Sequence, residues 1–213
     1  RIRFVSPHPI GFRQDLVQAF TYLPKLCSHI HFPMQSGSDR ILKMMRRPYR
    51  NETFLDLCAQ MKQARPDLSI TTDIIVGFPG ETEEDYLLTR QAVEQVQFDN
   101  AFIFRYSPRR GTPAAAMENQ IPEEVKAERQ AEIMELQQDI AFDMAEDMIG
   151  REVLVMIEGK DADENAYVGR TYKDAPNVDG LIFVNTDEEL MSGDFARVKV
   201  TGALEYDLIG ELM

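Results

Sequence analysis

Polar and histidine residues gather around one short β-type stretch, residues 28–34. The stretch is followed by side chains whose amide and hydroxyl groups suit ribose hydroxyls or a carboxylate, namely Gln35, Ser36 and Ser38. Within it, His29 and His31 occupy alternate positions, so a strand would place both imidazoles on one face. Two histidines without a nearby third ligand make a weak metal site, and packed, hydrogen-bonded imidazoles are the simpler interpretation.

A second chemistry-bearing segment, residues 71–82, carries Asp73 and then a turn rich in glycine and proline at residues 77–81. A glycine turn between a buried strand and a helix N-terminus brings backbone N–H groups close to a ligand without obstruction by Cβ atoms. The same turn is also typical of a strand end that binds nothing, and the pattern alone favours that simpler interpretation.

Basic side chains form two clusters. Lys43, Arg46, Arg47 and Arg50 surround Tyr49, and such a cluster could hold phosphate groups while the ring stacks on a base. A solvated basic loop explains it equally well. A second basic patch follows a later β-type run and contains Arg105, Arg109 and Arg110.

Alternating β-type and helical stretches must position these residues. Four β-type runs occur, at residues 2–6, 28–34, 68–76 and 101–107. Helical spacing of apolar residues occurs between them, at 15–23, 39–45, 52–63 and 83–96, with Thr82 as the expected N-cap of the last helix. This alternation predicts parallel strands with crossover helices, and in such folds chemistry takes place at the carboxyl ends of the strands. Four units do not close a barrel, so we expect earlier units to precede Arg1.

The C-terminal part has a different pattern. Pro122 opens a predicted helix that reaches about Met148 and is ended by Gly150. Five short β-type runs follow, at residues 152–158, 166–172, 180–184, 195–201 and 206–210. We therefore expect two domains, at residues 1–149 and 150–213, the second being a small five-stranded antiparallel β-barrel.

Charge divides along the same line. The 213-residue chain has a net charge of −13, but residues 1–115 carry 15 Lys+Arg and 12 Asp+Glu, whereas residues 150–213 carry 6 and 14. A basic nucleic-acid-binding surface over the whole molecule is excluded, and the acidic barrel would attract a basic protein. The two cysteines, Cys27 and Cys58, have no metal or disulfide spacing, which indicates a reducing cytoplasm. No apolar run is long enough to suggest a membrane span.

Several longer motifs occur together, at residues 6–9, 31–38, 45–49, 73–82, 106–109 and 111–114. They resemble the radical S-adenosylmethionine (SAM) methylthiotransferases, and the tRNA-modifying MiaB branch in particular. Residues 150–213 resemble the TRAM domain of these enzymes. Within it, residues 169–180, 193–195 and 205–207 look more like the RimO branch, which modifies an aspartate of a ribosomal protein.

The resemblance implies the later βα units of a partial TIM-type barrel followed by an OB-like TRAM domain. It implies SAM and 4Fe-4S clusters as cofactors, with the cysteine ligands outside this chain, and a reductant and a sulfur donor as partners. The implied reaction converts a C–H to a C–SCH3 bond on an isopentenyladenosine of tRNA, with a small-subunit ribosomal protein as the alternative substrate. No catalytic acid or base and no metal ligand is predicted.

Matching of motif positions assigns the candidate cofactor contacts, and the two basic clusters provide the candidate substrate contacts. Expected to contact the cofactor are Gln35, Ser36, Asp73, Val76, Gly77 and Tyr106. Expected to contact the substrate are Lys43, Arg46, Arg47, Tyr49, Arg50, Arg109 and Arg110. Two other classes of function stay open from the residues alone: a non-catalytic module that binds RNA or protein, and a hydrolytic or aldol-type barrel with His8, His31 and Asp73 around a divalent metal.

Overall fold

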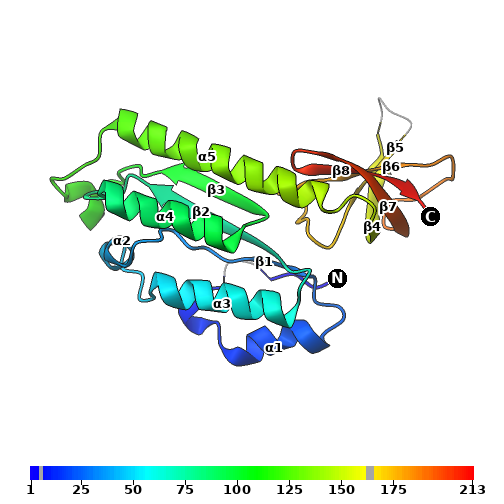
Figure 1. The fold of residues 1–213 in the computed structure, drawn as a ribbon, viewed down its shortest axis with the longest axis horizontal. Helices are drawn as coiled ribbons and strands as arrows, with labels where there is room; N and C mark the ends of the chain where they lie inside the picture. Colours follow the sequence, from blue (N-terminus) through cyan, green and yellow to red (C-terminus); the bar gives the residue numbers. More distant parts are fainter. Residues whose placement is uncertain (5–6, 162–165) are drawn as a thin grey trace. The chain divides into compact units, whose positions relative to one another are not determined.

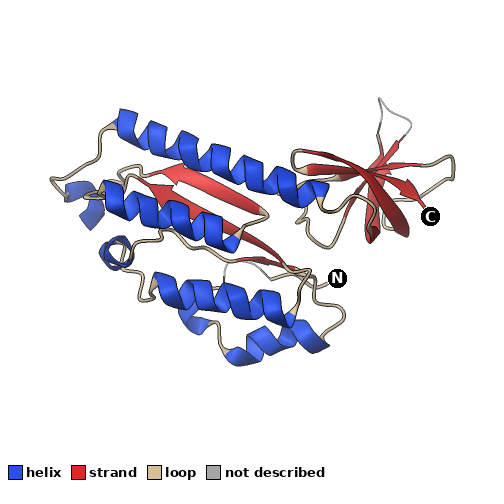
Figure 2. Cartoon of the chain, viewed as in Figure 1, coloured by secondary structure: helices blue, strands red, loops and turns tan. Residues whose placement is uncertain are grey.

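The residues that the computed structural model describes are 1–4, 7–161 and 166–213 (Figures 1 and 2). They divide into two compact units. The first consists of Arg1–Leu26 and Ile30–Gln137, and the second of Cys27–His29 and Gln138–Met213.

The first unit is built on a three-stranded sheet with the order β1-β2-β3. Its strands are β1 (His29–His31), β2 (Ser69–Val76) and β3 (Asn100–Arg105). β2 and β3 are parallel, and helix α4 (Glu83–Val96) connects them, as expected for a crossover unit. β2 is central and almost wholly buried, so the carboxyl ends of all three strands can contribute to one site.

Helices cover the sheet, and each agrees with the sequence pattern to within a residue or two. They are α1 (Gln14–Tyr22), α2 (Asp39–Met44), α3 (Asn51–Ala64) and α4. The start of α4 confirms the predicted cap, because Thr82 and Asp85 exchange side-chain-to-backbone hydrogen bonds in a capping box. α3 packs between α1 and α4 (Figure 1).

An aromatic core holds these layers together. α3 buries Phe54, Cys58 and Met61, which recur at helical spacing on one face. The Phe54 ring stacks on Phe32 next to β1, with centroids 4.9 Å apart, and lies 6.3 Å from Phe98. The core thereby fixes the segment that leads from β1 into the polar residues 35–38.

Two predicted strands of the first unit differ most from the sequence pattern. In the run 2–6, Ile2 forms only an isolated parallel bridge to Leu26, and residues 5–6 lie outside the described residues. The run 28–34 gives a strand of three residues, because Pro33 has no N–H and the Met34 N–H donates to the Thr72 hydroxyl at 2.9 Å. Pairing with β2 resumes at Gln35.

Helix α5 (Glu123–Glu146) leads into the second unit, close to the predicted range of 122 to about 148. Gly150 follows it with a φ of +84°, a conformation that favours glycine, and its N–H donates to Val200 O at 2.8 Å. The five strands are β4 (Glu152–Lys160), β5 (Ala166–Arg170), β6 (Ile182–Asn185), β7 (Phe195–Leu204) and β8 (Asp207–Leu212).

The strands close into a barrel with the order β4-β5-β6-β8-β7. Alternate residues of β4, including Val153, Val155 and Ile157, fill its interior. The expectation of a purely antiparallel barrel is wrong, because β6 and β8 pair in parallel. The reason is geometric: a closed ring with an odd number of strands cannot alternate in direction all the way round, so one pair must be parallel.

Among the described residues, no helix combines the length and the apolar character that crossing a lipid bilayer requires.

Candidate functional site

A cavity of about 570 Å³ opens in the first unit at the carboxyl ends of the strands. β2 contributes Asp73 and Ile75, and β3 contributes Phe104 and Arg105. The rest of the lining comes from segments that follow β1, α2 and β3, namely Gln35, Arg47, Tyr106, Ser107, Arg109, Thr112 and Ala114. The volume is in the range of cofactor and small-molecule sites, and the position is the one where parallel sheets bind ligands.

Gln35 reaches the cavity through an unusual backbone conformation. Its φ is +69°, in the left-handed region that few residues other than glycine adopt. β2 holds it there, because the Gln35 N–H donates to Asp73 O at 2.8 Å and Gln35 O accepts from the Ile75 N–H at 2.9 Å. A conformation of this cost is maintained where the surrounding structure fixes it, as at ligand sites.

Asp73 lies beside Gln35 in the lining. One carboxylate oxygen, Oδ2, is 3.3 Å from His31 Nε2. The other, Oδ1, has no partner among the described residues and is available to a ligand. Asp73 and Ile75 are two residues apart on β2 and so share the face that borders the cavity.

Tyr106 closes another wall. Its N–H donates to Val76 O at 2.9 Å, and its carbonyl accepts from Lys126 Nζ at 3.1 Å. The ring packs edge-on against Phe78, with centroids 5.2 Å apart. The buried phenol oxygen finds no hydrogen-bond partner within the described part of the chain. A buried phenol that borders a cavity and is left unpaired favours a polar group on the occupant.

Three guanidinium groups border the same space. Arg105 forms an ion pair with Glu123 at 2.9 Å, whereas Arg47 and Arg109 form no ion pair with any described residue. With Asp73 as the single acidic residue of the lining, the arginines give this side of the cavity a surplus of positive charge. That surplus suits an anionic group such as a phosphate.

Other predicted cofactor contacts lie outside the lining. Ser36 is buried, with its Oγ 3.3 Å from Thr89 Oγ1, and Val76 is buried on the face opposite Asp73. The Ser38 hydroxyl caps α2 and donates to Asp85 at 2.5 Å. These groups have partners in the fold and do not face the cavity.

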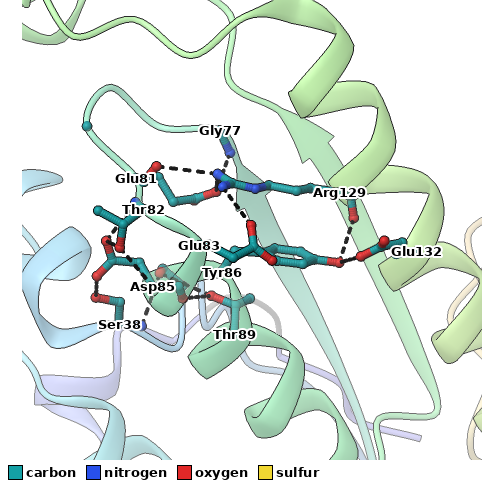
Figure 3. Close-up of polar contacts among 12 residues, drawn as sticks. Ser38, Gly77, Glu81, Thr82, Glu83, Asp85, Tyr86, Thr89, Arg129 and Glu132 are labelled. Carbon is teal, nitrogen blue, oxygen red and sulfur yellow. Dashed lines mark hydrogen bonds and ion pairs between the residues drawn. The ribbon is translucent and has the colours of Figure 1, made fainter.

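Gly77 starts a turn that is tied into the protein (Figure 3). Its φ is +70°, and its N–H donates to Glu81 Oε1 at 2.9 Å, the same oxygen that accepts from Arg129 Nη1 at 2.8 Å. A Cβ at Gly77 would lie 2.2 Å from Lys126 Cγ. The interpretation as a turn that binds no ligand therefore agrees with the contacts.

Charged groups in this network are strongly perturbed. Burial raises the pKa of Glu81, although the Gly77 N–H and the Arg129 guanidinium oppose the shift. Burial also raises the pKa of Asp85, but hydrogen bonds from Arg40, Ser38 and Thr82 outweigh it and leave that pKa below its ordinary value. Both carboxylates connect the start of α4 to neighbouring elements, and neither borders the cavity.

The predicted substrate residues divide into some that border the cavity and others that do not. Arg47 and Arg109 border the cavity, whereas Lys43, Arg46, Arg50 and Arg110 are exposed outside it. Tyr49 is buried and its hydroxyl donates to Met34 O at 2.9 Å. Burial raises the pKa of Tyr49 to about 12. Its ring supports the turn before Gln35 and is not exposed for stacking on a base.

The metal-dependent alternative finds no support. His8 accepts the Ile10 N–H and its ring lies 5.5 Å from Tyr49, while His31 contacts Asp73. Within residues 1–4, 7–161 and 166–213, no three His, Cys, Asp or Glu side chains are grouped for a metal ion. Cys27 and Cys58 are buried free thiols, and two thiols do not supply the ligands of a 4Fe-4S cluster.

Sequence reasoning missed several lining residues: Ile75, Phe104, Ser107, Thr112 and Ala114. Period-two alternation carried the signal for two of them. Ile75 follows Asp73 by two residues, and Phe104 precedes Tyr106 by two, so each shares a face with a predicted site residue.

Comparison with known proteins agrees with this architecture. Residues 1–93 match the model of the radical SAM superfamily, and residues 149–213 match the TRAM domain. The coproporphyrinogen III oxidase HemN of Escherichia coli, a radical SAM enzyme, superposes on 62% of this chain and 31% of its own with a TM-score of 0.52. At 15% identity this similarity concerns the fold alone.

Closer relatives cover almost the whole chain. A tRNA-2-methylthio-N(6)-dimethylallyladenosine synthase of Akkermansia muciniphila is 66% identical over 99% of this chain and 45% of its own length. The ribosomal protein uS12 methylthiotransferase RimO of Lachnoclostridium phytofermentans is 46% identical over 99% of this chain and 47% of its own. The chain thus spans about half the length of these relatives. Over 99% of its residues the chain is similar to this tRNA-2-methylthio-N(6)-dimethylallyladenosine synthase and to this ribosomal protein methylthiotransferase.

Proposed function

We propose that the protein containing this chain is a methylthiotransferase that converts a C–H to a C–SCH3 bond on the dimethylallyl-modified adenosine of tRNA. The observation that carries the proposal is the 66% identity, over nearly every residue of the chain, to a tRNA-2-methylthio-N(6)-dimethylallyladenosine synthase. The cavity at the strand ends is the place where this chain would contribute to the reaction.

The cavity fits SAM in its chemistry. Asp73 and Gln35 offer a carboxylate and an amide to ribose hydroxyls or an amino group, and the unpaired phenol of Tyr106 offers one more polar contact. Ile75 and Phe104 add apolar surface that shields a bound adenosyl group from water. One SAM, reductively cleaved when bound, would supply the radical that removes the hydrogen, and a second SAM would supply the methyl group that caps the sulfur.

The 4Fe-4S clusters do not fit this chain. Its two cysteines are buried apart from the cavity lining, and burial raises the pKa of Cys58 to about 12, which disfavours the thiolate that iron requires. The clusters, the reductant and the sulfur donor therefore act through other parts of the protein. This chain binds and orients groups around them.

The basic side of the cavity supports an RNA substrate. Arg47 and Arg109, which have no acidic partner in the described residues, can neutralise phosphates next to the modified nucleoside. Such contacts hold the strand in register while the base reaches the reacting centre.

A second candidate is methylthiolation of an aspartate in a ribosomal protein. The 46% identity to RimO favours it, as does the acidic character of residues 150–213, which carry 14 Asp+Glu against 6 Lys+Arg. A basic ribosomal protein would be attracted to such a domain, and RNA phosphates would be repelled.

Full-length protein, reconstituted anaerobically with iron and sulfide, distinguishes the two. It is incubated with SAM, a reductant, dimethylallyl-modified tRNA and the ribosomal protein in one mixture. Mass spectrometry of nucleosides and of tryptic peptides then shows which substrate gains the methylthio group. We expect 2-methylthio nucleoside in the tRNA. A methylthio-aspartate peptide with unmodified tRNA would overturn the proposal.

A further inference from the structure

Three side chains form a chain of polar contacts behind the cavity. His31 on β1 places Nδ1 2.9 Å from Thr71 Oγ1 and Nε2 3.3 Å from Asp73 Oδ2. Thr71 and Asp73 alternate on β2, so both face the imidazole. On another side, the ring of Phe102 lies 5.8 Å from the imidazole.

Acceptor and donor roles follow from the chemistry of the three groups. An ionised carboxylate only accepts, so His31 Nε2 must carry the hydrogen in the contact with Asp73. In a neutral imidazole Nδ1 is then the acceptor, and the Thr71 hydroxyl donates to it. Thr71 is 2% exposed, so its hydroxyl stays directed within the protein. The chain of donors selects one tautomer of His31.

The consequence falls on Asp73. The terminal torsion of a carboxylate is soft, so an unrestrained Asp73 would sample many orientations in the cavity. The contact of Oδ2 with the imidazole, at 3.3 Å, restricts that freedom and leaves Oδ1, which has no partner in the described residues, for a ligand. His31 itself is not part of the cavity lining, so it acts on a ligand through Asp73.

We propose that His31 is a positioning residue of the cofactor site: held by Thr71, it orients the Asp73 carboxylate toward bound SAM. The inference rests on the proposed function, since it takes Asp73 as a SAM contact. Orientation by a second hydrogen bond is the common way in which proteins fix the groups that touch a ligand.

The test is SAM binding by the full-length, cluster-containing protein, measured by anaerobic titration calorimetry. His31→Leu should raise the Kd of SAM about 5- to 10-fold, the value of roughly one hydrogen bond. His31→Gln keeps an amide N–H that can reach Asp73 and should stay within about 2-fold of the parent. Thermal unfolding of both variants checks that they fold equally well. If the Gln and Leu variants bind SAM equally well, His31 has no positioning role.

A double-mutant cycle separates this inference from the function on which it depends. Asp73→Ala should weaken SAM binding, and adding His31→Leu should then have no further effect. Unchanged SAM binding by Asp73→Ala would remove Asp73 from the cofactor site and so contradict that assignment in the proposed function. A different outcome is that Asp73→Ala weakens SAM binding while His31→Leu raises the Kd of SAM by the same factor in the parent and in the Asp73→Ala variant. That result would support Asp73 as a cofactor contact and contradict the positioning role of His31.

Two substitutions of Thr71 test the other contact of the imidazole. Thr71→Ser keeps the hydroxyl and should bind SAM like the parent. Thr71→Val removes it at nearly constant volume and should raise the Kd by about 2- to 3-fold, because the imidazole loses one of its two restraints. Equal affinities of the Ser and Val variants would show that Thr71 does not hold the imidazole for this purpose.

Discussion

The turn after β2 differs from the cavity-lining segments after β1, α2 and β3 in whether its polar atoms have partners within the protein. The turn after β2, residues 77–81, closes its polar groups on one another, since Glu81 accepts from both Gly77 and Arg129 (Figure 3). The segments after β1, α2 and β3 line the cavity, and some of their polar groups have no partner among the described residues, including the Tyr106 phenol and the guanidinium groups of Arg47 and Arg109. Glycine, proline and charge mark both regions, so residue type does not separate them. What separates the two regions is whether their polar atoms have hydrogen-bond or ion-pair partners within the protein.

The difference implies a division of labour. Atoms that are paired within the fold stabilise it and gain little from a ligand, whereas unpaired atoms at a cavity contribute little to folding and gain a partner on binding. Substitutions in the turn should therefore change the free energy of unfolding, and substitutions in the cavity should change affinity.

Loss of the arginine in the turn should have the largest effect. Arg129→Met leaves the Glu81 carboxylate, with 2% of its side chain exposed, without its cation. Removal of one partner of a buried ion pair costs roughly 3–5 kcal/mol of unfolding free energy. Unfolding in urea measures this loss of unfolding free energy. The control is Arg90→Met, which breaks an exposed pair with Glu94 and should cost under about 1 kcal/mol. Equal losses would contradict the special role of the turn.

A glycine pair isolates the packing of the turn from its backbone strain. Gly77→Ala adds a Cβ 2.2 Å from Lys126 Cγ at positive φ, and should cost at least about 2 kcal/mol from strain and overpacking together. Gly111 also has a positive φ, +84°, but a Cβ there meets no atom within 4 Å. Gly111→Ala should thus cost about 1 kcal/mol, and the difference between the two melting curves reports the contact with Lys126. A smaller loss for Gly77→Ala than for Gly111→Ala would show that Lys126 yields freely.

A substitution in the cavity should have the opposite effect, with little change in stability and a loss of SAM affinity. Tyr106→Phe removes an oxygen that has no partner in the described residues, so unfolding free energy should change by less than about 0.5 kcal/mol. SAM affinity should fall about 3- to 10-fold, the value of one hydrogen bond. Calorimetry on full-length protein measures the affinity. A clear loss of stability with unchanged SAM affinity would place Tyr106 with the turn residues instead.

The features that local chemistry determines were predictable from the sequence. Thr82 and the acidic first turn of α4 define its start without reference to the rest of the fold. Gln35 was a candidate because amide and hydroxyl groups at a strand end suit a ligand, whereas Asp73 was assigned by the position of its motif, and both border the cavity. The number of strands alone could have predicted the parallel pair β6 and β8, because five strands in a closed ring require one, but the prediction of an antiparallel barrel overlooked this.

The features that depend on distant partners were not predictable. The burial of Tyr49 depends on the Met34 carbonyl, 15 positions earlier in the chain. The role of Glu81 depends on Arg129, 48 positions later. Spacing along the sequence contains neither contact, so an exposed stacking ring was as reasonable as a buried one, and the pattern of the turn favoured, without identifying its partners, a turn that binds no ligand.

The smallest expected effect is on the salt dependence of tRNA binding. The test compares an arginine that borders the cavity with one that lies outside it. Arg47 borders the cavity, whereas Arg50 is exposed beyond it. If Arg47 contacts a tRNA phosphate, Arg47→Gln should reduce the slope of log affinity against log salt concentration by roughly 0.7–0.9. Arg50→Gln should leave the slope of the full-length protein unchanged, because screening weakens a charge that makes no direct contact. Filter binding at several salt concentrations measures both slopes. Equal reductions would mean that tRNA covers the whole basic cluster, and a reduction for Arg50→Gln alone would move the phosphate contact from the cavity to the exposed loop.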